Sequence, residues 1–107
     1  MKVPQTDWPL VFVSGAYSEG DRSINVRRAI TAGNHILDRE GVPFVPHLFH
    51  FWHRMFSKKR EIWLNMDIKF LSLCSFLVVC PYSDHSQGVV GEINYAVAHG
   101  IPIVEYD

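Results

Sequence analysis

The sequence predicts an α/β fold in which helices cover both faces of a parallel four-stranded sheet. Strand-like and helix-like patterns alternate along the 107 residues, and this order produces parallel strands joined by right-handed crossovers. The strands are expected at four short apolar segments, Leu10–Val13, Val42–Val45, Phe76–Cys80 and Ile101–Glu105. Three helices are expected between them, over Arg22–Glu40, Lys59–Leu73 and Gln87–His99. The predicted architecture is a Rossmann-like (flavodoxin-like) three-layer sandwich.

Each element has its own sequence signal. The first strand is a continuous apolar run that stops at Ser14-Gly15, which is typical of a buried parallel strand. The first helix has apolar residues at helical spacing until Gly41, and Gly100 closes the third helix in the same way. The second strand contains Pro43 and is followed by Pro46. Because proline cannot donate a hydrogen bond to a neighbouring strand, this strand is expected at an edge of the sheet.

Length and composition indicate one domain over residues 1–107. Hydrophobic residues make up 48% of the chain, enough for a packed core. A domain of this size buries a limited share of its surface, so a homodimer or larger homo-oligomer is expected. The formal net charge is -1 and no long basic stripe is present, which argues against binding to a nucleic acid polymer.

The sequence also points to the cytoplasm. Residues Met1–Trp8 lack the apolar run of a signal peptide, and the longest apolar run, Phe76–Pro81, is far too short to cross a membrane. The two cysteines, Cys74 and Cys80, do not form a CxxC pair. Buried reduced thiols are therefore expected. The protein is not expected to bind a membrane, since its apolar runs are too short.

Ligands of such folds bind at the carboxyl ends of the strands, so three loops matter most. They are residues 14–21, 46–58 and 81–87. The strongest signal is the stretch from Ser86 to Glu92, which follows the third strand and opens the third helix. Ser86 suits the N-cap, and Gly88 and Gly91 are unusual in a helix start unless a phosphate or sugar approaches the backbone.

Glu92 is the candidate nucleophile. It lies about one turn into the third helix, where the helix dipole is expected to keep it ionised. An ionised carboxylate beside a sugar can attack the anomeric carbon and form a covalent glycosyl-enzyme. In the alternative interpretation, Ser86 is an ordinary cap and Glu92 an ordinary acid near the start of a helix.

Asp67 is the second candidate. It lies within an apolar stripe at helical spacing, and burial there should raise its pKa. A carboxylic acid with a raised pKa can hand a proton to a departing base. In the alternative, Asp67 faces solvent and caps a helix or pairs with a lysine. The stripe consists of Trp63, Leu64, Asp67, Leu71 and Cys74.

The first loop, residues 14–22, has two glycines and several hydroxyl groups, which suit a turn that cradles a ligand. Tyr17 is expected to hold Glu92 or a sugar hydroxyl, and Arg22 to meet an anion. The alternative is a plain polar turn. The loop has neither a GxGxxG fingerprint nor a Walker lysine, so no cofactor is expected.

A run of three histidines, His47, His50 and His53, has a spacing that invites a metal site. The run lacks the H-E-x-x-H pattern and contains no cysteine or carboxylate, so we expect no bound metal. Aromatic residues are interleaved with the histidines. Packing or a dimer contact is the expected role of this segment, with stacking on a nucleobase as the alternative.

Three motifs together resemble the nucleoside 2-deoxyribosyltransferase superfamily, which includes 2'-deoxynucleoside 5'-phosphate N-hydrolases and small phage-type domains. The resemblance spans residues 11–104. Its first motif is Val11-Phe12-Val13-Ser14-Gly15, followed by Asn25 at the start of the first helix. The second is the stretch 63–71 around Asp67, and the third is Ser86-x-Gly88-x-x-x-Glu92 followed by Tyr95-Ala96. Cys74-Ser75 stands where many members carry an aspartate.

This resemblance implies roles for individual residues. Glu92 resembles the nucleophile, and Asp67 the acid near the scissile bond. Ser86 and Gly88 resemble the residues that hold the 5' end or phosphate. The first loop resembles the one beneath the sugar, and Asn25 belongs to the same motif. The residues of that loop are Ser14, Gly15, Ala16 and Tyr17.

Two functions follow. The first is cleavage of the N-glycosidic bond of a nucleoside or nucleoside 5'-monophosphate, with Glu92, Asp67 and Tyr17 as catalytic residues. Transfer of the sugar to water gives a hydrolase, and transfer to a second base gives a transferase. The second is a non-catalytic nucleotide sensor or sequestering module, since related folds host many functions.

Overall fold

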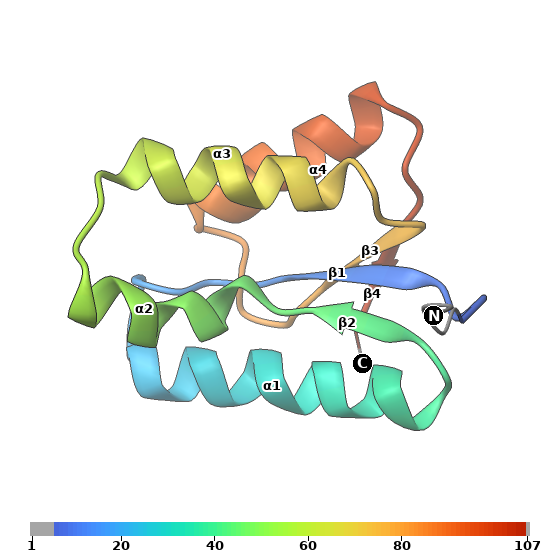
Figure 1. The fold of residues 1–107 in the computed structure, drawn as a ribbon, viewed down its shortest axis with the longest axis horizontal. Coiled ribbons are helices and arrows are strands. Elements are labelled where there is room, and N and C mark those ends of the chain that lie inside the picture. Colours follow the sequence, from blue (N-terminus) through green and yellow to red (C-terminus); the bar gives the residue numbers. More distant parts are fainter. Residues whose placement is uncertain (1–5, 107) are drawn as a thin grey trace, which may run out of the picture.

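A computed structural model of the protein describes residues 6–106 and contains the predicted parallel sheet (Figure 1). The strand order is β2-β1-β3-β4, and every neighbouring pair is parallel. The edge position predicted for the proline-containing strand is therefore confirmed. The strands are β1 (Leu10–Ser14), β2 (Val42–Phe44), β3 (Phe76–Val79) and β4 (Ile103–Glu105).

Helices cover both faces of the sheet, which gives the three predicted layers. Figure 1 shows α1 on one side and α3 with α4 on the other. The bounds of the helices are α1 (Arg22–Asp38), α2 (Phe49–Met55), α3 (Arg60–Leu71) and α4 (Gln87–Ala98). Among the described residues, no helix is long and apolar enough to span a membrane.

The helix starts follow the capping signals. The Asp21 carboxylate accepts hydrogen bonds from the backbone N–H groups of Ser23 and Ile24, at 2.9 and 3.2 Å. Ser86 caps α4 as predicted, and its hydroxyl accepts from the N–H of Val89 at 3.3 Å. These caps fix where α1 and α4 begin at the carboxyl end of the sheet.

The segment expected as a loop after β2 is instead a 3-10 turn, η1 (Pro46–Leu48), followed by α2. This short helix lacks the usual sequence signals, because Leu48 at its N-cap makes no side-chain hydrogen bond. It also buries no residue completely. With neither a cap nor a buried stripe, its pattern did not predict a helix.

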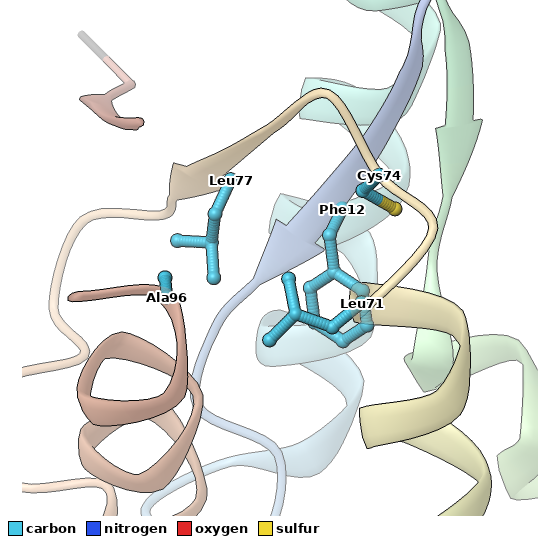
Figure 2. Close-up of a cluster of buried hydrophobic side chains, with 5 residues drawn as sticks. All are labelled: Phe12, Leu71, Cys74, Leu77 and Ala96. Carbon is cyan, nitrogen blue, oxygen red and sulfur yellow. The ribbon is translucent and has the colours of Figure 1, made fainter. Parts of the chain in front are cut away.

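The core lies in two layers, one on each face of the sheet. The layer under α3 and α4 contains Phe12 of β1, whereas the layer under α1 contains Val13. Adjacent residues of a strand point to opposite faces, so β1 serves both layers. Figure 2 shows the first layer, which consists of Phe12, Leu71, Cys74, Leu77 and Ala96.

Both cysteines are free and buried, one in each layer. Burial raises the pKa of the Cys74 thiol to about 11 and that of the Cys80 thiol to about 11. The thiols therefore act as small apolar groups, as the sequence predicted.

Candidate functional site

A cavity of about 340 Å³ opens at the carboxyl end of the sheet. This is the edge where the fold predicts a ligand. Four segments line the cavity: the loop after β1, the η1–α2 segment, one face of α3 and the first turns of α4. Six of the predicted site residues are among its lining: Gly15, Tyr17, Asp67, Ser86, Gly88 and Glu92.

Glu92 is held at this cavity by the end of β1. The side chain is only 9% exposed, and its Oε1 accepts a hydrogen bond from the Ser14 hydroxyl at 2.5 Å. Ser14 is itself fully buried, so water does not compete for this contact. Ser14 therefore orients the Glu92 carboxyl group rather than lining the cavity.

The expectation that Glu92 is ionised is wrong for the free protein. Burial raises the pKa of Glu92 to about 8, although the Ser14 hydrogen bond lowers it, and the charge of Asp67 adds to the rise. The helix dipole does not offset burial, because its effect is confined mainly to the first turn of α4 and Glu92 lies beyond that turn. Glu92 is therefore mostly protonated at neutral pH.

Asp67 lies on α3, and burial raises the pKa of its carboxyl group to about 7, as the sequence predicted. Within residues 6–106, its buried Oδ1 finds no hydrogen-bond partner. The solvent-facing alternative therefore does not apply. The apolar stripe divides along the helix, since Trp63, Leu64 and Asp67 line the cavity whereas Leu71 enters the core.

Ala16 and Asn25 support the first loop from behind, which corrects their assignment as ligand contacts. The Ala16 N–H donates to the Ser83 hydroxyl at 3.2 Å, and its carbonyl accepts from His47 at 3.0 Å. The Asn25 amide donates to the carbonyl groups of Tyr17 and Glu19, at 3.0 and 2.7 Å. Because these polar groups are already paired inside the protein, they fix the loop backbone rather than bind a ligand.

Tyr17 lines the cavity, but its hydroxyl hydrogen-bonds to Nδ1 of His50 rather than to Glu92. This corrects the expected contact between Tyr17 and the nucleophile. Arg22 lies outside the cavity lining, with its guanidinium carbon 5.6 Å from the centre of the Tyr17 ring. Arg22 is therefore placed to stack on Tyr17, a cation–π contact, rather than to meet an anion in the cavity.

The start of α4 has the open space that a ligand needs. A Cβ atom added to Gly88 would meet only the Ser86 hydroxyl, at 3.8 Å, so no protein atom in the described chain fills that side. Gly91 is exposed and outside the cavity lining, so of the two glycines only Gly88 leaves room for a ligand in the cavity. Ser86, Gly88 and the helix N-terminus together can bind an anion.

The sequence did not predict how much of the cavity the histidine segment builds. His47 is 5% exposed, and burial lowers its pKa. Its Nε2 lies 3.0 Å from the Ala16 carbonyl, which can only accept, so the imidazole carries its proton on Nε2. The Nδ1 atom is a buried acceptor with no partner in the described part of the chain.

The rest of this wall is aromatic and basic. Phe49 and Trp63 are stacked with ring centres 5.8 Å apart, and His53 accepts a hydrogen bond from the Trp63 indole at 2.8 Å. Lys58 and Arg60 line the same side. Nowhere in residues 6–106 do three or more histidine, cysteine or acidic side chains gather into a metal-binding group.

None of the curated proteins compared with the chain matches it. A family sequence model described as "Domain of unknown function (DUF7768)" matches residues 9–106. This range contains all four strands and every residue that lines the cavity. The chain therefore belongs to the DUF7768 family.

Proposed function

We propose that the protein cleaves the N-glycosidic bond of a nucleoside or nucleoside 5'-monophosphate, with Glu92 as nucleophile and Asp67 as proton donor. One observation carries this proposal. Buried Glu92 and half-buried Asp67 both line a single cavity, and the Ser14 hydroxyl fixes the Glu92 carboxyl group. Enzymes that cleave glycosidic bonds with retention of configuration at the anomeric carbon usually use two carboxyl groups, one as acid and one as nucleophile.

The raised pKa values allow the two carboxyl groups to share one proton near neutral pH. With pKa values of about 7 for Asp67 and about 8 for Glu92, the pair holds one proton between these pH values, and in the free protein this proton lies mainly on Glu92. The reactive form is the less populated one, in which the proton has moved to Asp67. When that proton is on Asp67, the Glu92 carboxylate bonds to C1' and the bond from C1' to the base nitrogen breaks. The electron pair leaves with the base, and the proton from Asp67 neutralises it. Water or a second base then releases the sugar from Glu92.

The remaining contacts would hold the substrate. Ser86, Gly88 and the start of α4 would bind the 5' end or its phosphate. Gly15 and Tyr17 would lie beneath the sugar. We further propose a cytoplasmic protein that forms a homodimer or larger homo-oligomer, since the exposed apolar side chains of α2 are suited to contact a second copy.

A panel of nucleosides and monophosphates, with free base measured by chromatography, tests the activity directly. Glu92→Ala should abolish base release but change ligand affinity by no more than about tenfold, because a nucleophile acts mainly in the transition state. Ser86→Ala should instead weaken binding of phosphorylated ligands more than that of unphosphorylated ones. Glu61→Ala, on the exposed first turn of α3, is the matched control and should leave both quantities unchanged.

One observation favours a second function, a nucleotide sensor. Glu92 is mostly protonated at neutral pH, and a neutral carboxylic acid can hold ribose hydroxyl groups without attacking C1'. In that case Glu92→Ala would abolish binding, and the unmodified protein would release no base from any substrate. A covalent adduct on Glu92, trapped with a 2-fluoro sugar analogue and detected by mass spectrometry, would decide for the enzyme.

A further inference from the structure

One wall of the cavity, here called the donor wall, offers hydrogen-bond donors to a ligand. It consists of His53, Lys58, Arg60 and Trp63. Nδ1 of His53 accepts two hydrogen bonds, from the Trp63 indole N–H at 2.8 Å and from the Lys58 backbone N–H at 3.2 Å. A ring nitrogen that accepts carries no proton, so the neutral imidazole carries its proton on Nε2. The polar group that His53 can still offer to a ligand is therefore a donor.

The charged neighbours of His53 have the same character. Lys58 and Arg60 line the cavity and can only donate hydrogen bonds. The Trp63 N–H is already used by His53 and its ring is stacked on Phe49, so Trp63 offers a ligand apolar surface rather than a donor. This wall therefore combines flat aromatic surface with donors and positive charge.

The first-loop wall offers acceptors instead. Glu19, which carries a carboxylate, is among the lining residues, and so is His47, whose buried Nδ1 has no hydrogen-bond partner within residues 6–106. Sugar hydroxyl groups donate hydrogen bonds, so this wall suits the sugar. The cavity is thus divided, with acceptors near the sugar and donors on the side of α2 and the start of α3.

The acid lies on the same helix face as the donors. Arg60, Trp63, Leu64 and Asp67 all line the cavity, at the spacing of one face of α3. Arg60 and Asp67 are seven positions apart on the helix, which is about 10 Å along the axis. A base whose glycosidic nitrogen lies at Asp67 would extend along Trp63 toward Arg60 and Lys58.

We infer that the base bound and released at this site is an oxo base, a pyrimidine or purine whose outer edge presents a carbonyl oxygen rather than an amino group. The inference rests on the proposed function. A carbonyl oxygen accepts from the donor wall, whereas an amino group would place donors against donors. As the bond to C1' breaks, the electron pair passes from the base nitrogen toward the carbonyl oxygens, where Lys58 and Arg60 stabilise it until Asp67 supplies its proton.

Titration of the wild-type protein with free bases, followed by NMR chemical shifts, tests this recognition without any turnover. The matched pairs are uracil with cytosine and hypoxanthine with adenine, and each pair differs chiefly in a carbonyl or amino group. We expect the oxo member of at least one pair to bind at least about tenfold more tightly. The double variant Lys58→Gln, Arg60→Gln should lower this ratio, because His53 is then the only one of the three donors that remains. Lys69→Gln, exposed at the other end of α3, should leave the ratio unchanged.

Three results would overturn the inference: no measurable binding of any base, equal or tighter binding of the amino bases, or a preference that is undiminished in the double variant. These results are distinct from failure of the proposed function, which is measured as base release from nucleosides. Preferred binding of oxo bases without any release would reject cleavage while supporting the base site. Release of amino bases in preference to oxo bases would support cleavage and reject the inference.

Discussion

Replacing Glu92 by glutamine should remove much of the pH dependence of the free energy of unfolding. Burial raises the pKa of Glu92 from 4.5 to about 8, so the folded protein keeps a proton that the unfolded chain releases. The corresponding stability is complete below pH 4.5 and is lost as the pH rises through about 8. Glutamine cannot ionise, yet its side-chain oxygen can still accept from the Ser14 hydroxyl.

The magnitude follows from the pKa difference. The rise from 4.5 to about 8 is about 3.5 pKa units, and at about 1.4 kcal/mol per unit it corresponds to about 5 kcal/mol. This value is an upper bound, because the protein relaxes and admits water when a buried carboxyl group ionises. We therefore expect Glu92→Gln to match the wild type near pH 4.5 and to exceed it by about 2 to 5 kcal/mol near pH 9.

Urea unfolding, followed by circular dichroism from about pH 4.5 to about pH 9, measures this difference. His47 contributes a slope of opposite sign, because its pKa is lowered by burial, but it is present in both proteins and cancels in the difference. Glu61→Gln, at an exposed position, is the control and should track the wild type at every pH. A difference between Glu92→Gln and wild type that stays constant with pH would refute the assignment of Glu92 as a buried acid.

Three further predictions concern the same site. The value of kcat/KM should have a bell-shaped pH profile with limbs near about 7 and about 8, because the carboxyl pair must hold a single proton; a profile that stays level across both limbs would contradict this. Asn25→Ala should lower the free energy of unfolding by about 1 to 3 kcal/mol, since two carbonyl groups of the first loop lose their donor, whereas the exposed Thr31→Ala should cost less in the same urea experiment. Elemental analysis should find no stoichiometric zinc at the His47–His53 run; zinc that is lost in His50→Ala would disprove this expectation.

The sheet could be predicted from the sequence because local signals and the final packing agree. Pro43 indicated an edge strand, and the uninterrupted apolar run in β1 indicated a strand buried on both faces. The burial of Asp67 could also be predicted, because an acidic residue within an apolar stripe lies on the same helix face as its buried neighbours. These features depend on residues close together in the sequence.

The protonation of Glu92 and the shape of the cavity wall could not be predicted in this way. Glu92 is buried against Ser14, 78 residues earlier in the chain, and no local pattern reports that contact. The short helix α2 has neither a cap nor a fully buried residue. It is packed through aromatic contacts such as that of Phe49 with Trp63, which exist only after folding. The two carboxyl groups are therefore visible in local patterns of the sequence, whereas the walls around them depend on long-range contacts.

The polar site continues directly from the core layer drawn in Figure 2. Ser14 lies two residues after Phe12 and on the same side of β1. Asp67 and Glu92 each lie four residues, about one helical turn, before a core residue of the same helix face. Those core residues are Leu71 and Ala96.

Ser14, Asp67 and Glu92 therefore form a polar layer that rests directly on an apolar layer of the core. A change of volume beneath them would tilt β1, α3 or α4 and alter the spacing of the two carboxyl groups without touching either one. Substitutions at Phe12, Leu71 or Ala96 would then act as adjustments of the acid pair, and selection on the chemistry would extend into what looks like ordinary hydrophobic packing.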